Sequence, residues 1–158
     1  MTENYLTLLE DSLQKKLQVL EKIQAYNLRQ QEIFQTGEAD LNKFDAYVAE
    51  KGTLIGELTA LDNGFETLYE RVAAELKENR SQYAAQIKRL QELVTKVTEY
   101  GVTIQAQEAR NKQLIENYFK NQRQDIKSAR TASKTAYDYY KNMNNTGHVP
   151  PQFMDSKK

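Results

Sequence analysis

Few residues in this chain could catalyse a reaction. It contains no Cys, and its one His is His148. A thiolate nucleophile and a two-His metal motif are therefore excluded, and a Ser-His-Asp arrangement would need that single imidazole. Helical bundles that bind pairs of metal ions use Glu-x-x-His motifs, but Asn145 stands three residues before His148. We predict a protein that is not an enzyme, with no catalytic residue, no metal site and no cofactor.

A run of basic residues could bind the phosphates of a nucleic acid. It consists of Arg110, Lys112, Lys120, Arg123, Lys127, Arg130 and Lys134. The whole chain is nevertheless neutral, with 22 Lys and Arg against 22 Asp and Glu and a pI of about 6.6. Acidic helices elsewhere can neutralise the run, and cations are favourable near the C-terminal end of a helix. We predict no nucleic-acid partner.

Aromatic residues crowd the last part of the helical pattern. They are Tyr118 and Phe119, followed by Tyr137, Tyr139 and Tyr140. An aromatic cluster with no partner in its own chain is typical of a docking surface for another protein. The alternative is a frayed, mildly amphipathic helix end.

The neutral sum hides an uneven distribution of charge. Residues 1–79 hold 8 basic and 15 acidic residues, a net charge of −7, whereas residues 80–158 hold 14 and 7, a net charge of +7. Opposite charges attract if the chain folds back on itself. The split therefore predicts a reversal near residue 79.

The elements that position these residues are helices. Apolar residues recur every three or four positions from Leu6 to Phe34, which predicts a helix over about 3–35. Lys16, Asn27 and Gln30 interrupt its apolar seam. From Leu41 a heptad pattern continues to Tyr118, and its apolar stripe is wide enough to pack against two other helices.

A single helix over 38–143 would be roughly 160 Å long, so the chain must turn. Asn63 and Gly64 favour a turn at 62–64, whereas the heptad pattern and the charge split favour 79–81. We predict an all-α antiparallel bundle or coiled coil with helices over about 3–35, 38–79 and 81–143. A fourth helix results if 62–64 is a full turn. Residues 1–143 form one domain, the last helix overhangs it, and 144–158 form a flexible tail.

Residues 1–5 have neither the basic start nor the apolar core of a signal peptide. No apolar run reaches the roughly 18–20 residues that a membrane span needs. We expect a cytoplasmic protein without membrane insertion.

Three stretches of the sequence are similar, in their order and spacing, to stretches of one protein family. They are residues 5–34, which begin YLTLLE, residues 37–61, and residues 108–117, EARNKQLIEN. Over residues 1–140 the chain resembles the flagellar export chaperones of the FlgN type. The first two stretches are similar to the family's first and second helices, and the third to an Asn-x-x-Leu-Leu/Ile segment of its last long helix. The family's second turn aligns near 79–82.

The resemblance implies a chaperone of the type III flagellar export system. Such a chaperone binds hook-associated proteins, which join hook and filament, prevents their premature polymerisation and delivers them to the export gate. We expect client binding at Asn111, Leu114, Ile115, Tyr118, Phe119 and Ile126. We expect docking to an export-gate component at Tyr137, Tyr140 and Phe153.

The chaperone interpretation predicts a monomer or weak homodimer. The alternative is a scaffold or tethering protein that self-associates through its heptads and has no export role. It predicts a stable oligomer with the tyrosines buried between copies.

Overall fold

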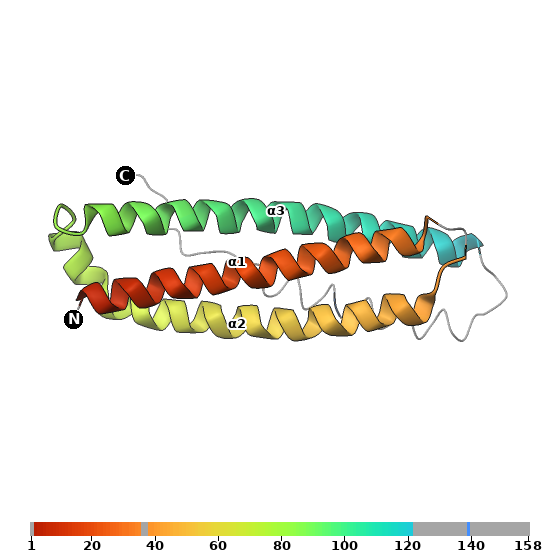
Figure 1. Cartoon of the computed structure of the whole chain (residues 1–158), viewed down its shortest axis with the longest axis horizontal. Helices are drawn as coiled ribbons and strands as arrows, with labels where there is room; N and C mark the ends of the chain where they lie inside the picture. The colour runs from red at the N-terminus through yellow and green to blue at the C-terminus, as the bar shows by residue number, and fades with distance from the viewer. Residues whose placement is uncertain (1, 36–37, 122–138, 140–158) are drawn as a thin grey trace.

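The described residues form three long helices, each antiparallel to the one before it in the chain (Figure 1). The computed structural model describes residues 2–35, 38–121 and 139. In it, α1 spans Thr2–Ile33, α2 spans Leu41–Glu78 and α3 spans Ala84–Asn121 (Figure 1). No strand occurs among these residues. The predicted all-α antiparallel bundle is confirmed.

α1, α2 and the start of α3 lie close to the predicted positions. α2 starts at Leu41 because Asp40 caps it: the carboxylate of Asp40 accepts a hydrogen bond from the backbone N–H of Lys43 at 3.1 Å. The described part of α3 has 38 residues, the same length as α2. Beyond Asn121 the structure describes only Tyr139 of the predicted last helix, and this residue is buried against the bundle rather than overhanging it. The other residues of the predicted overhang and the predicted tail lie outside the described residues.

Residues 62–64 continue the helix, so the alternative of a fourth helix is wrong. Asp62 Oδ1 forms an ion pair with Lys16 Nζ of α1 at 2.6 Å. The next seam residue, Phe65, is only 4 % exposed. These tertiary contacts outweigh the roughly 1 kcal/mol that Gly64 costs in a helix. Open space surrounds the position where a Gly64 side chain would begin, so the glycine serves no close packing.

The reversal lies at residues 79–83, as the heptad pattern and the charge split predict. The backbone N–H and side-chain amide of Asn79 both donate to Glu75 O, which closes α2. Gln82 and Tyr83 donate back to Asn79 O at 3.0 and 3.3 Å, which turns the chain. The ring of Tyr83 is buried and joins the core just before α3 begins.

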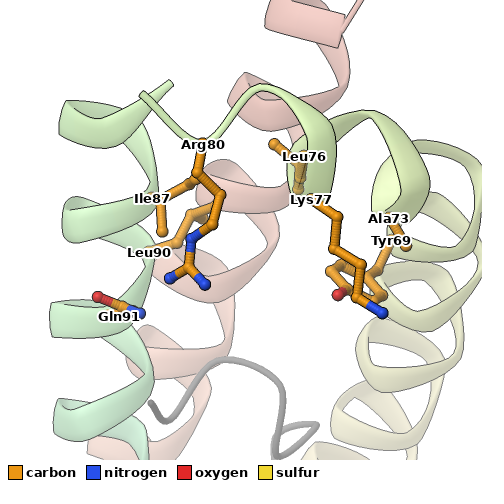
Figure 2. A pocket seen from close by; sticks show the side chains of 8 residues that line it. All are labelled: Tyr69, Ala73, Leu76, Lys77, Arg80, Ile87, Leu90 and Gln91. Carbon is orange, nitrogen blue, oxygen red and sulfur yellow. The ribbon is translucent and has the colours of Figure 1, made fainter. Parts of the chain in front are cut away.

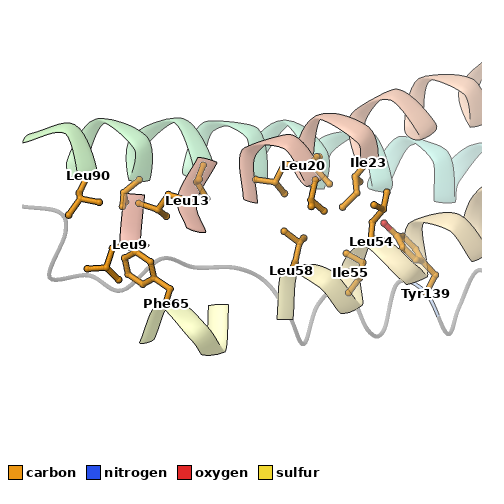
Figure 3. Packing of buried hydrophobic residues seen from close by; sticks show 14 of the residues in the cluster. Leu9, Leu13, Leu20, Ile23, Leu54, Ile55, Leu58, Phe65, Leu90 and Tyr139 are labelled. Atoms are coloured by element: carbon orange, nitrogen blue, oxygen red, sulfur yellow. The ribbon is translucent and has the colours of Figure 1, made fainter. Parts of the chain in front are cut away.

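α1 is the central helix of the bundle. It packs against both α2 and α3, whereas these two make no close backbone contact over the described residues. The apolar core follows α1 along its length and includes Leu9, Leu13, Leu20 and Ile23 (Figure 3). On the side of the bundle away from α1, the described parts of α2 and α3 are therefore connected only through their side chains.

Candidate functional site

The polar residues that interrupt the apolar seams pair with one another across the bundle. Asn27 and Gln30 of α1, Lys51 of α2, and Gln107, Glu108 and Asn111 of α3 are all buried. They lie at one level of the bundle, which we call the polar layer. Buried polar groups destabilise a core unless they are hydrogen-bonded. Each residue of the polar layer therefore needs its partners at the same level of the bundle.

Lys51 is the centre of the polar layer. Its ammonium donates to Asn27 Oδ1 at 2.7 Å and to the two carboxylate oxygens of Glu108 at 2.8 and 3.0 Å. Lys51 is completely buried and Glu108 is 4 % exposed. This ion pair links α2 directly to α3, while Asn27 connects it to α1.

Tyr139 closes the polar layer from beyond the three helices. Its hydroxyl donates a hydrogen bond to Glu108 Oε2, and Lys51 Nζ lies 4.1 Å from the centre of its ring. The side chain is 4 % exposed and sits at the edge of the apolar core, beside Leu54 (Figure 3). We call the place of this ring, between Lys51 and Glu108, the Tyr139 site. There Lys51 contacts the face of the phenol ring and Glu108 accepts the hydrogen bond of its hydroxyl.

Amide side chains complete the polar layer. Asn27 Nδ2 donates to Gln107 Oε1 at 3.1 Å, and Asn111 Nδ2 donates to the backbone carbonyl of Asn27 at 3.0 Å. Gln30 Nε2 donates to Phe44 O at 3.3 Å. Asn111 Oδ1 has no hydrogen-bond partner in the described part of the chain. The amides hold α1 in one position relative to α2 and α3.

Burial lowers the pKa of Lys51 from its ordinary 10.5 to about 8, although the charge and hydrogen bonds of Glu108 oppose the change. A lysine with a lowered pKa is a candidate nucleophile or base in an enzyme. Here Tyr139, Asn27 and Glu108 surround the amine, which has no exposed surface. We therefore interpret Lys51 as a structural cation.

The predicted client-binding residues divide into two groups. Asn111 and Ile115 face the core and are 0 % and 3 % exposed. Leu114, Tyr118 and Phe119 lie in the last two turns of α3 and are partly accessible. Ile126 lies outside the described residues, as do the predicted gate-docking residues Tyr137, Tyr140 and Phe153.

Four aromatic residues, of which Phe44 is completely buried and the other three are partly accessible, form a cluster at the end of the bundle where α1 ends. The ring of Phe34 lies 5.6 Å from that of Phe44 and 5.9 Å from that of Tyr118. Tyr118 in turn lies 6.0 Å from Phe119, so the four rings form a chain. We call these four residues the aromatic end. Tyr118 therefore has partners in its own chain, contrary to the expectation of an unpartnered aromatic helix end.

The ion pairs follow the predicted charge split only in part. Arg89 of the basic half donates to Glu10 of the acidic half at 3.2 Å, on the surface. In the buried pair the signs are reversed, since Lys51 comes from the acidic half and Glu108 from the basic half. The third pair, Lys16 with Asp62, lies within the acidic half. The bulk charges agree with the reversal at 79–83, but the buried contacts depend on individual residues.

Within residues 2–35, 38–121 and 139, no group of three or more His, Cys, Asp or Glu could hold a metal ion. None of the three described helices is long and apolar enough to cross a membrane.

Comparisons with known proteins add no family assignment: no family model matches the sequence, and neither a curated protein nor a solved structure matches the chain.

Proposed function

We propose that the chain is a cytoplasmic chaperone of the type III flagellar export system. It binds hook-associated proteins, prevents their premature polymerisation and delivers them to the export gate. The support is the resemblance of residues 1–140 to the FlgN type and a bundle whose one end carries accessible apolar and aromatic side chains.

The observation that carries the proposal is the position of Leu114, Tyr118 and Phe119. They are partly accessible on the last turns of α3, and the ring of Tyr118 contacts that of Phe34, which directly follows α1. A polymerising subunit carries amphipathic helices, and such a helix binds an apolar groove through residues spaced three and four apart. Leu114 and Tyr118 are four residues apart, and Phe119 directly follows Tyr118. We place the first contact of the client on these three residues.

Asn111 and Ile115 would enter the client contact only after a rearrangement. Asn111 is hydrogen-bonded to the backbone of α1, and Ile115 is in the core. A client helix that reached them would have to displace α1 locally. The gate-docking role of Tyr137, Tyr140 and Phe153 rests on the resemblance alone.

The alternative function, a self-associating coiled-coil scaffold, needs an apolar seam that is open to a second copy. In the described helices the seam residues Leu9, Val48, Leu90 and Val97 are buried against other helices of the same chain. This arrangement favours the chaperone, for which we expect a monomer or weak homodimer in a solution-mass measurement.

The proposal is tested by co-purification with each hook-associated protein of the source organism. The double variant Leu114→Lys/Phe119→Lys places charges on the proposed contact. We expect client affinity to fall about tenfold or more, because residues at the centre of such a contact contribute on the order of 1–2 kcal/mol each. The matched control is Glu116→Lys/Asn117→Lys, on exposed positions of the same two turns.

Circular dichroism should show the same helix content for both double variants. Equal client affinity in the two variants contradicts the placement of the contact. Failure of the unsubstituted chain to bind any hook-associated protein contradicts the proposed function.

A further inference from the structure

A pocket opens between α2 and α3 at the end of the bundle where the chain reverses. Leu76 and Leu90 are its buried floor, and Tyr69, Ala73 and Ile87 are partly buried walls. Its volume is about 120 Å³. The pocket lies on the side where α2 and α3 make no close backbone contact (Figure 2).

Two cations border this apolar pocket. Lys77 in the last turn of α2 and Arg80 in the turn that follows are exposed, and their side chains extend along the opening (Figure 2). The remaining lining residue, Gln91, is uncharged. An apolar floor with a cationic border fits an apolar side chain that stands next to a carboxylate. A bare anion fits less well, because no buried polar group points into the pocket to bind it.

The chain itself contains a segment of this chemistry. Residues 140–158 include one acidic residue, Asp155, and it directly follows Phe153 and Met154. The only acidic side chain of these 19 residues therefore directly follows an aromatic ring and a flexible thioether.

The length of the chain allows the segment to reach the pocket. Tyr139 is held at Glu108, which lies 18 residues along α3 from Leu90, or roughly 27 Å. Phe153 is 14 residues beyond Tyr139, and 14 residues span at most about 46–50 Å. The Tyr139 site thus fixes one end of a tether, which raises the effective concentration of Phe153–Asp155 at the pocket.

We propose that this pocket binds the chain's own Phe153-Met154-Asp155 segment. The apolar side chains of Phe153 and Met154 cover Leu76, Ile87 and Leu90, and the carboxylate of Asp155 pairs with Arg80 and Lys77. Together with Tyr139, the segment then covers the side of the bundle between α2 and α3. The docking does not depend on the chaperone function.

A paramagnetic label tests the proposal in the full chain. The sequence has no Cys, so Ser81→Cys, at an exposed position in the turn beside Arg80, places one nitroxide near the pocket. We expect it to reduce the amide signals of residues 153–155 in a nuclear magnetic resonance spectrum. The matched control, Lys120→Cys, lies 30 residues from Leu90 along α3, roughly 45 Å away, and should leave those signals unchanged.

Charge reversal tests the predicted ion pair. Arg80→Glu, in the chain labelled at position 81, should return most of the lost intensity, and addition of Asp155→Lys should remove it again. No loss of intensity from the label at 81, or equal losses from both labels, overturns the proposal. So does a loss that appears only when a labelled chain is mixed with a separate isotope-enriched chain, because the occupant is then a second copy.

Discussion

The polar layer and the apolar layers of the bundle contribute to the fold in different ways. Around Leu9, Phe65 and Leu90 the buried side chains are mostly apolar, and many apolar pairings across such a seam have similar energies. The nearby Lys16–Asp62 pair joins only α1 and α2. At the polar layer, Lys51, Asn27 and Glu108 satisfy one another in a single arrangement. A shift of α3 by one heptad, roughly 10 Å, would keep an apolar seam but separate Lys51 from Glu108. The apolar layers stabilise the bundle, and the polar layer selects its register.

The largest expected effect comes from removing one partner of the buried pair. Glu108→Ala leaves the ammonium of Lys51 buried without its carboxylate, and we expect a loss of about 3–5 kcal/mol in the free energy of unfolding. Urea denaturation followed by circular dichroism measures it. The apolar counterpart is Leu90→Ala, for which we expect about 3 kcal/mol from lost burial and the cavity. A loss below about 1 kcal/mol in Glu108→Ala would mean that the pair is not buried as described.

An intermediate effect is expected from pH. The pKa of Lys51 is about 8 in the folded chain and about 10.5 when unfolded, so between these values the unfolded chain binds more protons. The contribution of Lys51 to the free energy of unfolding therefore rises with pH. From pH 7 to 9.5 we expect a rise of about 2 kcal/mol relative to the variant Lys51→Met/Glu108→Leu, which lacks the buried ion pair.

All other titrating groups are common to the two proteins in this pH comparison, so their effects cancel in the difference. Parallel stability profiles from pH 7 to 9.5 would show that burial does not lower the pKa of Lys51.

The smallest expected effect comes from the Tyr139 site. Tyr139→Phe keeps the ring over Lys51 but removes the hydroxyl that donates to Glu108. We expect a loss of about 1.5–2 kcal/mol in the free energy of unfolding, the lower part of the range for one hydrogen bond to a charged group. Tyr100→Phe is a suitable control, because its hydroxyl makes a long, exposed bond of 3.4 Å to Glu21. Equal losses in the two variants would mean that the Tyr139 hydroxyl is not held at Glu108.

The helices and the reversal could be predicted from the sequence because they depend on periodic patterns. The heptads and the charge split both indicated a turn near 79–81, and Asn79 and Tyr83 form it. The dipeptide Asn63-Gly64 pointed to a turn that does not exist. Local propensity gave no account of the Lys16–Asp62 pair and the buried Phe65, which keep α2 helical there.

The polar layer was visible in the sequence as defects in the seams, but its pairing was not. Asn27, Gln30 and Lys51 weaken a heptad pattern wherever they stand. Which polar residue meets which depends on the register between helices that are far apart in sequence, such as Lys51 and Glu108. Tyr139 had no periodic signal at all, since its partner lies 31 residues away on a different part of the chain.

The most direct test of the central claim is the double variant Lys51→Met/Glu108→Leu, measured for both stability and uniqueness of structure. Buried ion pairs can be replaced by apolar residues of similar size with little loss or even a gain in stability. If the polar layer selects the register, the free energy of unfolding should stay within about 1 kcal/mol of the unsubstituted chain, while the amide signals of residues 27–30 split into more than one set. A single set of signals together with a loss of about 3–5 kcal/mol, as expected for Glu108→Ala, would contradict the claim.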